Sequence, residues 1–304
     1  MNHRFLIIFT FVILSAYAVT MINQEGSGEE EKWFLLNLHQ HIWDGEEWGR
    51  DRVNYTIVFD LMFNGSYFDF DGVLINDQLP KKDELKAYSD YVTEKYPGKL
   101  YLVGGHYHIY WRGEELSISI IMPRENASSL PDDFYECEEI TNLTLEEIAS
   151  AVHSAGGLLI WDHPFAALTS LNNEEIDTLM NLFDGIELVS VRGMRGAGSL
   201  AREELDMFWD KVEPYVADGK IFPAAVTDYS AYLGIPEKRG AFWVNKNYGT
   251  LIKSPSLDEE SIIEAFRKKN TVALLQTKDG DLIVYGKPVL AEEVKERLYR
   301  GTLR

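Results

Sequence analysis

The stretch from Trp33 to His41, WFLLNLHQH, is an apolar, strand-like run that ends on two histidines. The same pattern recurs in three further apolar runs, each with a histidine or an aspartate near its end: KLYLVGGHYH (residues 99–108), GGLLIWDHPF (156–165) and KIFPAAVTDY (220–229). Because the carboxyl ends of parallel strands converge on one face of an α/β sheet or barrel, these side chains are expected to meet there. The repetition predicts a metal site.

His39 and His41 are separated by one residue. Side chains with this spacing lie on the same face of a strand, so both imidazoles can bind one ion. The corresponding positions of the other three runs carry, in chain order, His106, His108, His163 and Asp228. A single histidine at a strand end is ordinarily a packing or hydrogen-bonding residue, but five histidines at one topological position favour metal binding.

Alternating strand and helix patterns predict the fold class. Strands are indicated over residues 33–38, 55–63, 71–76, 100–105, 116–122, 157–162, 185–190 and 221–227, and helices over residues 81–95, 144–154, 173–182, 199–216 and 256–269. Strand–helix–strand order at this spacing argues for parallel pairing with right-handed crossovers. The apolar segments LLIW and FPAAV are typical of strands that are buried on both faces. The predicted fold class is α/β, in the form of an irregular (β/α) barrel.

The first 22 residues predict an export segment. Arg4 precedes the uncharged run from Phe5 to Ile22, and Ala16-Tyr17-Ala18 resembles a signal-peptidase site. The whole run is also nearly long enough to span a bilayer, so both a cleaved signal peptide and an N-terminal membrane anchor are open. Either alternative gives an extracytoplasmic domain, secreted or anchored, that meets the membrane only through this segment.

The remainder divides into three predicted parts. Residues 23–32 form an acidic linker, residues 33–290 form one large domain, and residues 291–304 form a C-terminal helix or tail. The 49 acidic and 29 basic residues give a net charge of −20, which repels nucleic acid, so no nucleic-acid partner is expected and a small-molecule substrate is favoured. Cys137 is the single cysteine, which excludes an intramolecular disulfide.

An ordered series of motifs resembles the PHP (polymerase and histidinol phosphatase) domain family, and within it the CehA/McbA-like metallohydrolases. Residues 37–41, NLHQH, are similar to the family's D-L-H-x-H, residues 156–165 to its G-G-x-x-x-x-x-H-P, and residues 184–187 to its D-G-I-E. The resemblance spans roughly residues 35–286. It implies a distorted seven-stranded, TIM-like (β/α) barrel of PHP type, which carries up to three divalent metals at its C-terminal face and hydrolyses phosphoesters or related bonds.

The chain departs from this pattern at several ligand positions. Gln78 stands where the motif T-D-H supplies a histidine, Ser230 stands where S-D-x-H ends in one, and His106 replaces an expected glutamate. The histidine of the following hairpin is missing, with Ser117 or Ser119 in that region. The site is therefore expected to be partly degenerate and to hold one or two ions. Its expected metal ligands are His39, His41, His106, His163 and Asp228.

Three or more neutral histidines with a carboxylate suit zinc first, with manganese and iron as alternatives. Asp77 and His108 are the candidates for catalytic proton transfer, and Asp77 and Asp162 are candidates for orienting ligand histidines. Glu187 is a third candidate for proton transfer, but its place within a strand favours a structural role.

These observations lead to an exported metal-dependent hydrolase, in which a metal-activated water attacks a phosphoester or a related amide or carbamate bond. The alternative is a PHP-derived binding or scaffold protein that has lost catalysis. A third interpretation, an α/β domain without metal, requires the histidines to lie apart.

Overall fold

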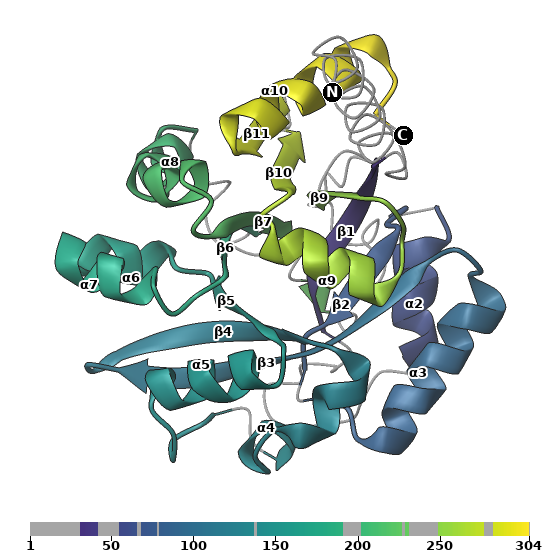
Figure 1. The fold of residues 1–304 in the computed structure, drawn as a ribbon, viewed down its shortest axis with the longest axis horizontal. Helices are drawn as coiled ribbons and strands as arrows, with labels where there is room; N and C mark the ends of the chain where they lie inside the picture. The colour runs from purple at the N-terminus through teal and green to yellow at the C-terminus, as the bar shows by residue number, and fades with distance from the viewer. Residues whose placement is uncertain are drawn as a thin grey trace, which may run out of the picture.

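Eleven strands of the described residues form one continuous sheet that curves into a nearly closed barrel (Figure 1). The computed structural model describes residues 31–41, 55–65, 68–77, 79–136, 139–190, 202–226, 229–230, 249–276 and 282–303. This mixed α/β architecture confirms the predicted fold class, a TIM-like barrel.

The strands are β1 (Lys32–His41), β2 (Gly72–Ile75), β3 (Leu100–Trp111), β4 (Glu114–Met122), β5 (Leu158–Asp162), β6 (Gly185–Ser190), β7 (Phe222–Val226), β8 (Tyr229–Ser230), β9 (Gly249–Ser254), β10 (Thr271–Gln276) and β11 (Leu282–Gly286). The helices are α2 (Tyr55–Phe63), α3 (Lys82–Lys95), the 3₁₀ helix η1 (Arg124–Ser129), α4 (Asp133–Glu136), α5 (Leu145–Ser154), α6 (Phe165–Ser170), α7 (Asn173–Leu179), α8 (Arg202–Ala217), α9 (Glu259–Arg267) and α10 (Pro288–Arg300).

The strand order is β11-β10-β9-β1-β2-β3-β4-β5-β6-β7, with β8 paired to β1. Parallel pairs join β1 to β2, β2 to β3, β5 to β6 and β6 to β7. β4 is antiparallel to both of its neighbours, which departs from a regular parallel barrel. At the far side, Thr250 of β9 donates its hydroxyl to the Ala225 carbonyl of β7 and accepts the Ala225 N–H, each at 3.0 Å. This pair of bonds joins β7, at one end of the strand order, to β9, the third strand from the other end.

Alternation along the strands separates two apolar layers. On β5, Leu158 and Ile160 belong to a cluster inside the barrel, whereas Leu159 and Trp161 face the layer between the strands and the outer helices. Phe266 of α9 packs against Phe222, the first residue of β7, with the rings tilted at 38° and their centroids 4.8 Å apart. Helix α9 therefore covers the end of the barrel at which the parallel strands begin.

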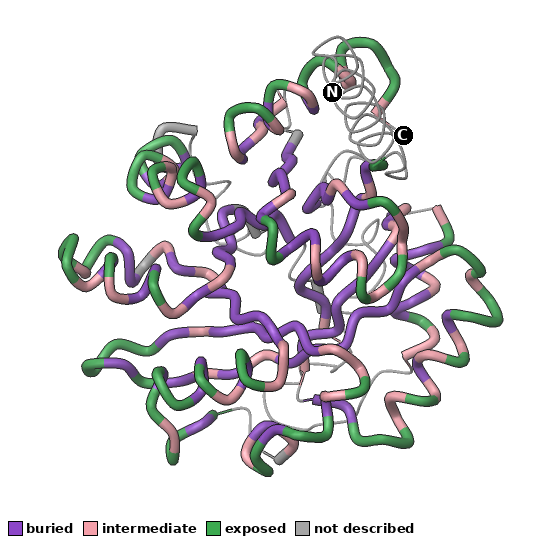
Figure 2. The backbone as a smooth tube through the Cα atoms, viewed as in Figure 1, coloured by how far each residue is buried: buried purple, intermediate pink, exposed green. Residues whose placement is uncertain are grey.

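The remaining helices surround the sheet, with α2 and α3 on one side and α6 and α7 on the other (Figure 1). The barrel strands are almost continuously buried, and the outer helices alternate between buried and exposed residues (Figure 2).

The strand predicted over residues 55–63 is wrong, because these residues form α2. A short, wholly apolar run does not distinguish a strand from a buried helix by periodicity. The helix is favoured because Val58, Phe59 and Met62 repeat at helical spacing and are all buried. Phe59 packs between α3 and β3, with its ring centroid 6.1 Å from that of Tyr88 and 5.6 Å from that of Tyr101.

Within the described residues, no helix has the length and apolar character needed to span a bilayer. The apolar run at residues 5–22 lies outside them. Helix α10 begins at Pro288 and buries Val294 against the outer apolar layer.

Candidate metal centre

The inner face of the barrel changes from apolar to polar along each strand that contributes to the site. On β3, Leu100 and Leu102 line the apolar interior, and the same alternation continues through Gly104 to His106 and His108. On β5, Leu158 and Ile160 also face the apolar interior, and Asp162 occupies the next inner position. The polar groups therefore gather at the end of the barrel opposite α9.

An irregularity in β1 brings two more histidines to this end. The register between β1 and β2 shifts between Asn37 and Gln40, and such bulges commonly re-aim a side chain. His39 is wholly buried, and its Nε2 lies 3.0 Å from Nε2 of His41. The two imidazoles therefore lie side by side at this end of the barrel, with ring centroids 4.9 Å apart.

His163 reaches the same place through an unusual backbone. It follows β5 with φ of 40°, in the left-handed region that residues other than glycine rarely adopt. Its N–H donates to Oε2 of Glu187 at 3.2 Å, which fixes the turn before Pro164. The conformation directs the imidazole toward His39, and the two rings stack with centroids 4.8 Å apart.

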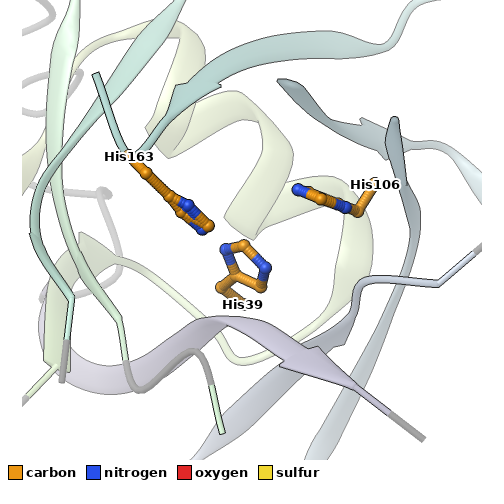
Figure 3. A group of neighbouring side chains, drawn as sticks. All are labelled: His39, His106 and His163. Carbon is orange, nitrogen blue, oxygen red and sulfur yellow. The ribbon is translucent and has the colours of Figure 1, made fainter. Parts of the chain in front are cut away.

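Three imidazoles from β1, β3 and the end of β5 point toward one another: His39, His106 and His163 (Figure 3). One ring nitrogen from each lies within 4.8 Å of the others, and Asp162 and Glu187 make a second such group with His39. The separations are 3.4 Å from His39 Nδ1 to Glu187 Oε2, 3.8 Å from His163 Nε2 to Glu187 Oε2, and 3.8 Å from His106 Nε2 to Asp162 Oδ2.

The 3.4 Å separation matches that of two ligands on one divalent ion, and the two 3.8 Å separations are slightly longer. Two ligands on a tetrahedral zinc ion at about 2.0–2.2 Å stand about 3.3–3.6 Å apart, which is longer than a hydrogen bond. His106 Nε2 is buried and has no hydrogen-bond partner among the described residues. Burial, followed by the nearby His39, His41, His108 and His163, holds the pKa of His106 well below its ordinary value, so the imidazole stays neutral and keeps a lone pair. Neutral imidazoles with carboxylates are the donor set that zinc, iron and manganese accept.

Two further predicted residues lie beside this group. Asp77, after β2, has Oδ1 3.1 Å from Nδ1 of His41, which is the position of a carboxylate that orients a histidine. The ring of His108 lies 4.9 Å from that of His106, but its side chain is 40% exposed. Its Nδ1 is 3.1 Å from Glu115 Oε1 and 3.3 Å from Ser117 Oγ.

The structure brings His39, His41, His106 and His163 together, with Asp77 and His108 at the edge. Asp228 lies outside the described residues, as does Gln78. Glu187, which sequence reasoning treated as structural, is wholly buried and close to both His39 and His163. Its signal was the alternation of β6, in which Ile186 and Leu188 face the outer layer and leave Glu187 on the inner face.

No protein-family model and no curated protein matches the sequence. Among solved structures, the chain is similar to a two-domain protein from Bacteroides vulgatus that contains a predicted PHP-like metal-dependent phosphoesterase. The TM-score is 0.51 and the identity 13%, over 80% of this chain and 65% of the other. At that identity the likeness shows the fold alone, and this chain spans less than two thirds of that protein.

Two other similar structures are an amidohydrolase from Chromobacterium violaceum and Endonuclease Q bound to a duplex substrate. The first has a TM-score of 0.45 and 11% identity over 68% of this chain and 90% of the other. The second has a TM-score of 0.49 and 16% identity over 77% and 56%. Because both TM-scores are below 0.5, these likenesses support no conclusion about this chain.

Proposed function

We propose that this protein is a PHP-type metal-dependent hydrolase, related to the CehA/McbA-like branch, that cleaves a phosphoester or a related amide or carbamate bond. The observation that carries the proposal is the convergence of three imidazoles and two carboxylates at one end of the barrel. Catalytic residues of TIM-like barrels gather at the end where the parallel strands finish, and this group lies there. The fold shared with a PHP-like protein agrees with it.

The donors proposed to hold one or two divalent ions are His39, His41, His106, His163 and Asp228, joined by Asp162 and Glu187. Zinc is the first expectation, with manganese and iron as alternatives. A divalent ion bound there supplies Lewis-acid polarisation of the substrate and a water of lowered pKa.

The chain's own residues supply orientation and proton transfer. Asp77 holds the Nδ1 side of His41, which leaves Nε2 directed at His39. His108 lies between the buried cluster and solvent, with Glu115 to accept from its ring, so it is placed to carry a proton out of the site.

The proposals on substrate class, partners, export and domain bounds rest on the sequence. We propose a small-molecule substrate and no nucleic-acid partner, because the net charge is −20. We also propose that residues 1–22 direct export and leave the protein secreted or anchored, with residues 23–32 as a linker, residues 33–290 as the hydrolase domain and residues 291–304 as its C-terminal extension.

Elemental analysis of a fragment that starts at Glu31 tests the proposal, beside His39→Ala and His163→Ala. We expect stoichiometric metal in the parent fragment, its loss in both variants, and metal-dependent turnover on a panel of phosphoesters, amides and carbamates. His153→Ala is the matched control, because His153 lies on α5 and pairs with Asp184 at 2.8 Å, away from the cluster. Its metal content should equal that of the parent.

Two results would redirect the proposal. Metal binding without turnover on any panel would favour the non-catalytic binding or scaffold protein. A folded, metal-free fragment that cannot be reloaded would overturn the metal centre altogether.

A further inference from the structure

A chain of buried polar side chains lies behind the metal centre and ends on Asp162. Asn76 follows β2, Ser119 is in the middle of β4, and Asp162 is the last residue of β5; all three are buried. Asn76 Nδ2 bonds to the Leu38 carbonyl at 3.0 Å and to Ser119 Oγ, and Ser119 Oγ bonds to Asp162 Oδ2.

The direction of every bond in the chain follows from the Leu38 carbonyl, which can only accept. It requires the amide nitrogen of Asn76, not the amide oxygen, to face it. The second N–H of the same nitrogen donates to Ser119 Oγ. Ser119 has thereby accepted a bond, and its single hydroxyl hydrogen is committed to Asp162 Oδ2.

The oxygen that Ser119 selects is the one that faces the histidines. Asp162 Oδ2 lies 3.8 Å from His106 Nε2 and 4.0 Å from His39 Nδ1. Without the hydroxyl, the carboxylate could turn about its χ2 torsion, which is broad for aspartate. The anchor of the chain, Leu38, immediately precedes His39, so the chain also ties the carboxylate to the strand that carries the central imidazole.

We infer that Ser119 and Asn76 are positioning residues that fix Asp162 Oδ2 as a donor to the metal. The inference rests on the proposed function, since it gives these two side chains a task in the same site. Ser119 pairs with His106 in the register of β3 and β4, in the region where the family pattern has a histidine that this chain lacks. In this chain the hydroxyl serves the site through a neighbouring carboxylate instead.

Titration calorimetry with Zn²⁺ on the metal-stripped fragment tests the inference through a double-mutant cycle of Ser119→Ala and Asp162→Asn. Loss of a group that orients a ligand typically weakens metal binding 10–100-fold, and we expect that loss for Ser119→Ala. In the Asp162→Asn background, Ser119→Ala should produce no further loss, because Ser119 acts through that carboxylate.

Thr271→Val is the matched control. Thr271 is another buried hydroxyl of the barrel, and its Oγ1 has no hydrogen-bond partner among the described residues. Its removal should leave the Zn²⁺ affinity unchanged. Asn76→Leu gives a second test if Ser119→Ala does not fold: it frees the Ser119 hydroxyl to turn away from Asp162, and it should weaken Zn²⁺ binding only while Asp162 is present.

The outcomes separate the inference from the proposed function. A parent fragment that binds no Zn²⁺ refutes the metal centre, and the inference falls with it. A parent that binds Zn²⁺ while Ser119→Ala and Asn76→Leu bind it equally well leaves the metal centre standing and overturns the inference. An equal loss in the presence and absence of Asp162 also overturns it, because Ser119 would then act by another route.

Discussion

Two groups of charged and imidazole side chains lie at opposite ends of β5 and β6. At the ends where these strands begin, Asp184 accepts from His153 Nε2 at 2.8 Å and from the Leu159 N–H at 3.0 Å, and Lys269 Nζ donates to the Asp184 carbonyl at 3.0 Å. At the ends where the strands finish, the histidines and carboxylates stand 3.4–4.0 Å apart.

The difference in spacing indicates that the Asp184 group has a structural role, and it agrees with the metal-binding role that we propose for the histidine group. The Asp184 group is complete, because its members meet at hydrogen-bond distance and each donor finds an acceptor. In the histidine group, these imidazole and carboxylate atoms are close to the separation of two ligands that share an ion, with one pair at 3.4 Å and the others at 3.8–4.0 Å. The first group should therefore govern the stability of the metal-free protein, and the second should govern metal binding.

The largest expected effect comes from Asp184→Ala. Lys269 is only 7% exposed, so removal of Asp184 leaves a buried ammonium without its counterion. Breaking a buried pair in this way costs about 3–5 kcal/mol of the free energy of unfolding. Urea unfolding of the metal-free fragment measures the loss. The Zn²⁺ affinity of this variant should equal that of the parent. A tenfold weaker affinity would show that the Asp184 group also contributes to metal binding.

The pH dependence of unfolding provides the control for that variant. Burial opposes ionisation of Asp184, but the His153 hydrogen bond and the Lys269 charge outweigh it and hold the pKa of Asp184 below its ordinary value. The stabilisation is therefore present above the pKa of the unfolded carboxyl and is lost as the pH falls through the folded pKa. Asp184→Ala should remove this acid-side decline, and an unchanged decline would assign it to other carboxyls.

The next effect is the stabilisation that metal itself provides. Free Zn²⁺ at 100 times its dissociation constant should raise the free energy of unfolding by about 2.7 kcal/mol, because the proposed metal centre forms only in the folded chain. Thermal unfolding with and without a chelator measures the shift. The shift should be absent in His163→Ala and full in His153→Ala, and an equal shift in both variants would place the metal elsewhere.

The fold and part of the histidine group could be predicted from the sequence. The features that could not be predicted were missed for physical reasons. The barrel and the convergence of His39, His41, His106 and His163 follow from apolar runs that end on histidines, since parallel strands finish at one end of a sheet. The role of Glu187 escaped prediction, because the alternation of β6 gives its face of the barrel but not its distance from His39 and His163, which lie on other strands.

The hydrogen-bonded series from Asn76 through Ser119 to Asp162 could not be predicted for a different reason. Asn76 and Ser119 are 43 positions apart, and their bond depends on how strongly the sheet curves. Local patterns fix neither that curvature nor the bulge in β1. The helix at residues 55–63 was missed because its apolar run is short, and tertiary burial against α3 decided its conformation.

Helix α5, which carries His153, is the site of the smallest change in stability that we predict. Thr144 caps this helix: its hydroxyl accepts the Glu147 N–H at 3.2 Å, and the Glu147 carboxylate accepts the Thr144 N–H at 2.8 Å. Thr144→Ala should lower the free energy of unfolding by about 1 kcal/mol, the usual cost of a lost N-cap, with the same measurement by urea. Because the helix anchors the complete group and not the histidine group, the Zn²⁺ affinity should stay at the parent value. A weaker affinity would mean that the two ends of β5 are coupled through the strand, and the division between a structural end and a metal-binding end would no longer hold.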